Sequence, residues 1–136
     1  TGEIVPVSGT PMDCRQLKPI GAEIDEAYEA LEFGKGYDHN WVLNKKGYRK
    51  AAFMRSKESG IAMEVYTDLP GLQFYTANFV DHEKGKEGAV YNMRQAACFE
   101  TQYFPDAVHK DHFEGPEVKA GEIYETTTAY RFIKGE

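Results

Sequence analysis

From residue 37 onward the sequence is a succession of short strand patterns joined by tight turns, with no helical pattern between them. Residues 61–66 show this most clearly, because their side chains alternate with the period of two that a strand imposes. Strands that follow each other through short turns pair antiparallel, whereas parallel strands need a long crossover. The sequence therefore predicts an all-β fold, an antiparallel β-sandwich or a part of one.

Turn and breaker residues divide the chain into its expected elements. Strands are predicted at residues 3–7, 40–43, 50–55, 61–66, 72–77, 95–102 and 123–133, with an extended segment at 12–16 and surface loops at 78–88 and 104–119. Apolar residues at helical spacing predict one short helix over residues 23–31, which the glycines of residues 34–36 end.

The length and charge of the chain restrict the class of protein. A chain of 136 residues can bury one core, and a net charge of -6 without a basic stripe argues against nucleic acid and anionic membranes as partners. No apolar run approaches the length of a membrane span. The two cysteines, Cys14 and Cys98, cannot form a disulfide framework and fit a reducing compartment, so we expect a cytoplasmic protein.

The first residues have strand character and lack an initiating methionine. We therefore expect that residues 1–136 are either a single domain or the C-terminal portion of a larger sandwich. Processing and a designed boundary would explain the same beginning.

The predicted strand 95–102 carries one acid, Glu100, in its middle. Alternation places Ala96, Cys98, Glu100 and Gln102 on one face, which otherwise suits burial. A buried carboxylate needs a partner, because burying an unpaired charge is costly. From this stretch alone, Glu100 is either a structural acid bonded to a neighbouring arginine or amide, or a functional one.

Common site motifs are absent or incomplete. The loop at residues 34–40 has no Walker lysine and is followed by a strand, so it is no phosphate loop; its Asp38 and His39 either stabilise a turn or reach into a binding site. His109 and His112 lack the ligand spacing of a metal site, and no metal is expected. No nucleophile elbow is present, and His82 lies in a charged loop that we expect to be solvated.

What remains is a set of acids, amides and aromatic rings. The polar members are Asp38, Gln73, Glu100 and Gln102, and the aromatic members are Trp41, Phe74 and Tyr75. Carboxylates and amides exchange hydrogen bonds with hydroxyl groups, and aromatic rings cover C–H faces. Such a set suits a neutral sugar, as one of several candidate ligands.

Several stretches together resemble the aldose 1-epimerase (galactose mutarotase) family. They are GYDHN at 36–40, EVYT at 64–67, PGLQFYT at 70–76, GAVY at 88–91, CFETQYFPDA at 98–107 and the ending at 121–132. They keep the family order and approximate spacing over nearly the whole chain. The chain resembles only the C-terminal part of the family, whose members are more than twice as long.

This resemblance implies a fold and an activity. The family fold is a large antiparallel β-sandwich, and its enzymes interconvert the α and β anomers of aldohexoses such as galactose and glucose without a cofactor. By resemblance, Glu100 is the catalytic base, Asp38 a ligand of a sugar hydroxyl and Gln73 a further sugar contact. A base that takes up and returns a proton needs a pKa near the working pH, and partial desolvation in a sandwich cleft would raise the pKa of a glutamate toward that value.

The resemblance also has departures. The family's histidine acid, second histidine and arginine lie in the N-terminal part, and none of the four histidines here matches the acid. Ala97, Phe99 and His109 replace residues more usual in the family. Two alternatives therefore stay open: a non-catalytic sugar-binding or regulatory module, and an open-edged fragment that pairs with a separate N-terminal chain or with a second copy of itself.

Overall fold

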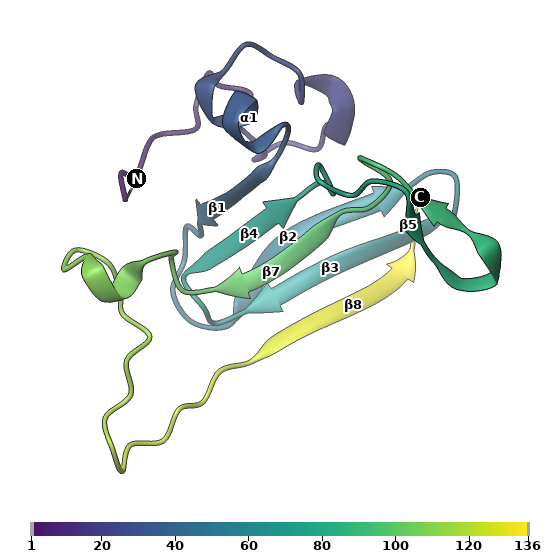
Figure 1. Cartoon of the computed structure of the whole chain (residues 1–136). Coiled ribbons are helices and arrows are strands. Elements are labelled where there is room, and N and C mark those ends of the chain that lie inside the picture. Colours follow the sequence, from purple (N-terminus) through teal and green to yellow (C-terminus); the bar gives the residue numbers. More distant parts are fainter. Residues whose placement is uncertain (1, 136) are drawn as a thin grey trace. The chain divides into compact units, whose positions relative to one another are not determined.

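The computed structural model describes residues 2–135 and is mostly β, with antiparallel sheets as the sequence predicts (Figure 1). The chain divides into two compact units, one made of residues 3–39 and 73–98, the other of residues 40–72 and 99–135 together with Gly2. The strands are β1 (Asp38–Val42), β2 (Arg49–Ser56), β3 (Ile61–Thr67), β4 (Gly71–Tyr75), β5 (Glu83–Lys84), β6 (Val90–Tyr91), β7 (Cys98–Gln102) and β8 (Thr128–Lys134). The helices are α1 (Glu29–Gly34) and the short 3-10 turns η1 (Ile20–Ala22), η2 (Lys86–Gly88) and η3 (Ala107–His109).

In the second unit, β3 lies between β2 and β8 in an antiparallel sheet (Figure 1). A tight turn at residues 57–60 joins β2 to β3, and the register with β2 shifts between Lys50 and Ala52. The register with β8 is regular, from Ile61 opposite Lys134 to Thr67 opposite Thr128. Because β3 is paired on both sides, it carries the most deeply buried residues of this sheet, among them Val65 and Thr67.

The beginning of β8 differs from the predicted strand at residues 123–133. The ladder with β3 ends at Thr128, and the preceding backbone N–H, that of Thr127, donates to both carboxylate oxygens of Asp68 at 3.0 and 3.1 Å. This N–H bonds a side chain in the turn after β3. Residues 123–127 are therefore irregular, and Ile123 is 90% exposed.

In the first unit, a small core forms around Tyr37 and Phe74, whose rings stack with centroids 5.4 Å apart. Met12, Ile24 and Leu31 are also buried, and the Tyr37 hydroxyl donates to the carbonyl of Pro11 at 3.0 Å. This core anchors the N-terminal segment without any strand: the predicted strand at 3–7 and the extended segment at 12–16 are turns and irregular chain.

The predicted helix at residues 23–31 is displaced. Ile24 and Leu31 are buried as the helical spacing implies, but residues 23–28 are mainly turns and bends, and α1 begins at Glu29. The helix ends where Lys35 adopts a left-handed conformation, with φ of 53°, and Gly36 donates its N–H to the carbonyl of Leu31. The predicted glycine-rich end is thus correct, while the first residues of the prediction are wrong.

The strands β1, β4 and β7 form a three-stranded sheet in that order. These strands contribute the residues that the sequence singles out: Asp38 begins β1, Gln73 lies in the middle of β4, and Glu100 in the middle of β7. Asp38 and Gln73 belong to the first unit and Glu100 to the second.

Candidate functional site

Asp38 is held at the point where the glycine-rich loop after α1 becomes a strand. Its carboxylate is half-buried, and its Oδ1 accepts a hydrogen bond from Nε2 of Gln73 at 2.8 Å. The two residues are 35 positions apart in the sequence, so the fold, and no local turn, brings them together. The predicted sugar-hydroxyl ligand and the predicted further sugar contact thus form one pair.

Gln73 keeps hydrogen-bonding capacity after this contact. Its Oε1 atom is buried and has no hydrogen-bond partner among residues 2–135. A buried acceptor without a partner is costly, so such atoms call for an explanation. A hydroxyl group is a donor that would satisfy this oxygen, and the neighbouring Asp38 carboxylate is a charged acceptor for the same kind of group.

His39 is engaged with the backbone. Its Nδ1 accepts the N–H of Asp38 at 3.0 Å, so its Nε2, 3.0 Å from the carbonyl of Ala30, is the nitrogen that donates. Burial lowers the pKa of this imidazole, against the raising effect of the Ala30 carbonyl. Of the two roles that the sequence left open, these contacts support the structural one: His39 ties the start of β1 to α1.

Glu100 is exposed on β7, as are Ala96 and Cys98 on the same face. The prediction that this face suits burial is therefore wrong for these three residues. On the opposite face Phe99 and Thr101 are half-buried, and the hydroxyl of Thr101 lies 2.6 Å from that of Thr128 in β8.

The Glu100 carboxylate makes no hydrogen bond or ion pair with any residue that the structure describes. The structural alternative, an acid bonded to a neighbouring arginine or amide, is thus not met within residues 2–135. The carboxylate is accessible to a ligand.

The remaining members of the predicted set divide between the two units. In the second unit, Gln102 donates to Oδ1 of Asn40 at 3.2 Å, and that Asn40 atom would lie 2.5 Å from a Cβ placed on Gly71. In the first unit, Phe74 is buried against Tyr37 and belongs to the core, so it is no open platform for a sugar.

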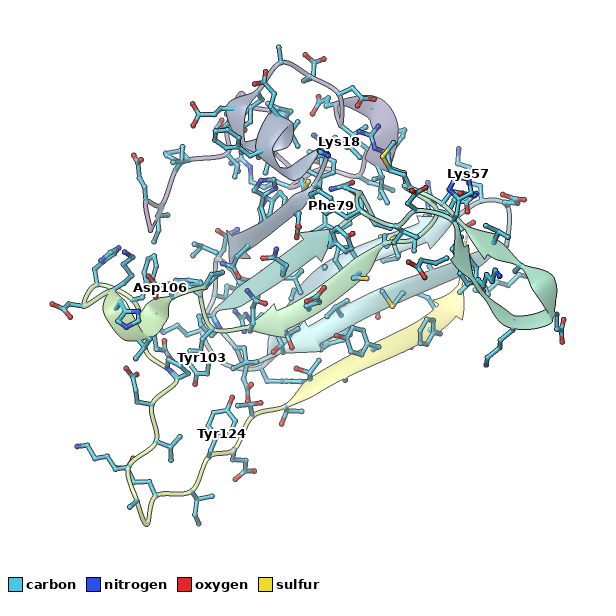
Figure 2. All side chains as sticks on the ribbon, in the orientation of Figure 1. Lys18, Lys57, Phe79, Tyr103, Asp106 and Tyr124 are labelled. Atoms are coloured by element: carbon cyan, nitrogen blue, oxygen red, sulfur yellow. The ribbon has the colours of Figure 1, made fainter. Side chains whose placement is uncertain are left out.

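Among residues 2–135, no cluster of three or more His, Cys, Asp or Glu side chains is arranged to hold a metal ion. His109 instead contacts Asp106 at the turn η3, where Figure 2 labels Asp106, and this contact is the main cause that lowers the pKa of the Asp106 carboxyl. Cys14 and Cys98 are both free thiols. None of the helices in the described part of the chain is long and apolar enough to cross a bilayer.

Sequence reasoning missed the residues that hold the loop before Asp38 in place. Thr76 and Asn78, just beyond β4, are buried and bond the loop that precedes Asp38. Arg94 donates to both carboxylate oxygens of Asp25 and to the Lys35 carbonyl in the same unit. These partners are far apart in the sequence, 41 residues for Asn78 and Tyr37 and 69 for Arg94 and Asp25, so no local pattern could have revealed them.

Comparison with known proteins identifies relatives along the whole chain. The sequence profile of the family described as Aldose 1-epimerase matches residues 1–131. Galactose mutarotase from Bos taurus is 42% identical over 134 residues, that from Homo sapiens 40% over 136, and the aldose 1-epimerase of Escherichia coli 33% over 133. The chain spans 38% of the length of each of these relatives.

A solved structure agrees with this result. The GalM/aldose epimerase homologue from C. elegans superposes with a TM-score of 0.87 and 29% identity, covering 100% of this chain and 40% of its own. The likeness extends over the described strands, so the predicted fold class is confirmed. The chain belongs to the aldose 1-epimerase family.

Proposed function

We propose that this chain carries the general base and part of the sugar-binding site of an enzyme that interconverts the α and β anomers of aldohexoses such as galactose and glucose. The observation that carries the proposal is that the Glu100 carboxylate, which by resemblance matches the family's base, is exposed and bound to no residue that the structure describes. A carboxylate without a structural partner is available to accept a proton from a substrate.

In the proposed reaction, Glu100 takes the proton of the anomeric hydroxyl while a histidine acid protonates the ring oxygen. The bond between C1 and the ring oxygen breaks, the open aldehyde rotates about C1–C2, and closure on the other face returns both protons. No electrons or groups are transferred, so the step needs no cofactor. By the resemblance, this acid comes from the N-terminal part of the family fold, whereas the present chain resembles the C-terminal part.

The pair of Asp38 and Gln73 supplies sugar contacts in this proposal. The charged oxygen atoms of Asp38 accept a sugar hydroxyl, and Gln73, whose Nε2 donates to Asp38, is the further sugar contact. Because their mutual hydrogen bond fixes both side chains before a ligand arrives, less ordering remains to be done on binding. We also propose a cytoplasmic location, which the two free thiols support.

The test is Glu100→Gln in the complete enzyme, with polarimetry of freshly dissolved α-galactose. Glutamine keeps the shape of the side chain but cannot accept the proton, so kcat should fall by roughly 10²–10⁴-fold. Glu125→Gln, the same change at an exposed position in irregular chain, is the matched control and should be neutral. Near-normal turnover of Glu100→Gln would refute the assignment of Glu100 as the base. A wild-type protein that binds galactose but shows no turnover would favour the non-catalytic module.

A further inference from the structure

A buried side chain, that of Asn78, bonds the loop that leads into Asp38 at two places. Its Nδ2 donates to the carbonyl of Gly34 at 2.8 Å and to the carbonyl of Tyr37 at 2.9 Å, so both amide protons are used. Asn78 is 3% exposed and therefore makes these bonds out of competition with water. Between α1 and β1 the loop lacks a regular backbone ladder, and Asn78 supplies bonds in its place.

Thr76 orients the Asn78 amide. Its hydroxyl lies 2.7 Å from Oδ1 of Asn78 and 3.1 Å from the Tyr37 carbonyl, and its backbone N–H donates to the same carbonyl at 3.0 Å. With 2% of Thr76 exposed, this is a buried polar network. Because Oδ1 faces the hydroxyl and Nδ2 faces the carbonyls, the amide has one favourable orientation.

The backbone has accommodated this side chain. Gly36 has φ of 132°, and a Cβ built on it would lie 2.5 Å from Oδ1 of Asn78. A side chain at position 36 would displace the amide, so Gly36 is needed both for its conformation and for the close approach. The loop and Asn78 therefore fit each other closely.

The network bonds the backbone next to both members of the Asp38–Gln73 pair. Tyr37, whose carbonyl receives three of the bonds, is the residue before Asp38, and Thr76 is the first residue after β4, which carries Gln73. Asn78 and Thr76, just after the end of β4, bond the backbone just before the start of β1. The contact between the Asp38 and Gln73 side chains therefore depends on these bonds.

We propose that Asn78 is a positioning residue for sugar recognition, which acts through Tyr37 to hold the Asp38 carboxylate against Gln73. The inference rests on the proposed function, because it assumes that Asp38 binds a sugar hydroxyl. Asn78 itself touches no substrate. An amide is required at this position, because an aspartate of the same shape would turn carboxylate oxygens toward two carbonyl oxygens.

The experiment is a double-mutant cycle in the complete enzyme, read as the Kd for galactose by titration calorimetry. Asn78→Asp and Asp38→Ala should each weaken binding about tenfold or more, and the double variant should be no weaker than Asp38→Ala alone, because residues that act through one another are not additive. Asn92→Asp makes the same change at a half-buried asparagine of the same unit and should be neutral.

A milder variant keeps the test decisive if Asn78→Asp fails to fold. Thr76→Val retains the volume and the backbone bond but removes the hydroxyl that orients Asn78, and it should raise Kd severalfold with the same non-additivity. Circular dichroism and thermal melting establish that each variant is folded. Additive losses, or unchanged binding in a folded Asn78 or Thr76 variant, would overturn the inference. If Asp38→Ala binds galactose normally, the proposed role of Asp38 in sugar binding fails instead.

Discussion

At the scale of single residues, the contact between Asp38 and Gln73 leads to a prediction about the affinity for galactose. Asp38→Ala in the complete enzyme should weaken galactose binding by about 1.5–3 kcal/mol, the usual contribution of a hydrogen bond to a charged group. Titration calorimetry measures this loss directly. Asp81→Ala removes an aspartate whose side chain is 85% exposed, and it should leave the affinity unchanged. Equal affinity of the Asp38 variant and the wild type would leave Asp38 only a role in the turn.

His39 leads to a prediction about pH. Its pKa is lowered by burial in the folded protein, so the unfolded chain binds more protons as the pH falls below the ordinary value of 6.5. The free energy of unfolding therefore has its full value above pH 6.5 and declines as the pH falls from 6.5 toward the lowered pKa of His39. Urea unfolding of the 136-residue chain between about pH 7.5 and about pH 5 should show this decline.

The variant His39→Gln should flatten that decline, because glutamine does not titrate. His82→Gln is the control, since His82 is a histidine with an 81% exposed side chain, and it should keep the wild-type slope. If both variants keep the slope, another group causes it.

At the scale of elements, Glu64 of β3 ties the three strands of its sheet together. The carboxylate is buried and accepts hydrogen bonds from Lys50 of β2 at 3.2 Å, from Arg131 of β8 at 3.3 Å and from the Tyr66 hydroxyl at 3.0 Å. The Lys50 bond is the largest of the causes that lower the Glu64 pKa below its ordinary value of 4.5. The side-chain bonds of Glu64 thus join β3 to β2 and to β8, in addition to the backbone hydrogen bonds of the sheet.

We predict that Glu64→Gln lowers the urea midpoint of the chain at neutral pH and that the difference from wild type disappears at low pH. A lowered folded pKa contributes stability that is present above 4.5 and is lost as the pH falls through the folded pKa. Glu58→Gln changes an exposed glutamate in the turn between β2 and β3 and should have no such effect. A constant difference at all pH values would show that the charge of Glu64 is not what matters.

The strands that the sequence predicted best are those whose neighbours are local. Residues 61–66 alternate clearly and pair with residues 50–55 across a short turn, and the two segments are found as β3 and β2. Residues 123–127 have the same strand-like composition but no ladder partner, since Asp68 takes the N–H of Thr127. Residues 3–7 likewise form no strand, and Ile4 and Val5 are about half exposed. Composition shows that a strand is possible, whereas a partner decides whether it forms.

The candidate site was predictable to a similar degree. The motifs identified Asp38, Gln73 and Glu100, and the fold brings the first two into contact. The buried support from Asn78 and Thr76 was not predictable, because it consists of side-chain bonds to backbone carbonyls that are 39 and 41 residues away. The exposure of Glu100 also depends on which face of β7 meets β8, and strand alternation alone does not say which face that is.

At the scale of the whole molecule, we expect the 136-residue chain alone to show little or no mutarotase activity above the spontaneous rate. In the proposed reaction Glu100 is the base, but by resemblance none of the four histidines matches the family's acid, so ring opening would be only half catalysed. Polarimetry of the purified chain tests this. Full activity would show that His39, His82, His109 or His112 provides the acid.

The surface of the same chain predicts self-association. On one face of the β2–β3–β8 sheet, Ile61, Tyr130 and Phe132 are 52%, 45% and 67% exposed, and β8 is an edge strand. Exposed apolar side chains beside an unpaired edge favour association with a second copy. Light scattering should therefore report a mass above that of the 15.4 kDa monomer. Phe132→Lys should shift the mass toward the monomer, and a monodisperse wild-type monomer would contradict the prediction.

The order of the strands also has a consequence in time. The central strand β3 is complete at Thr67, but its second neighbour begins at Thr128, 61 residues later. A ribosome adds about 5–20 residues per second, so during synthesis one edge of the β2–β3 hairpin stays open for roughly 3–12 s. In that interval the nascent hairpin can pair with another chain. The yield of folded protein in the cell should therefore depend on chaperones that bind the nascent chain before the last strand, β8, emerges.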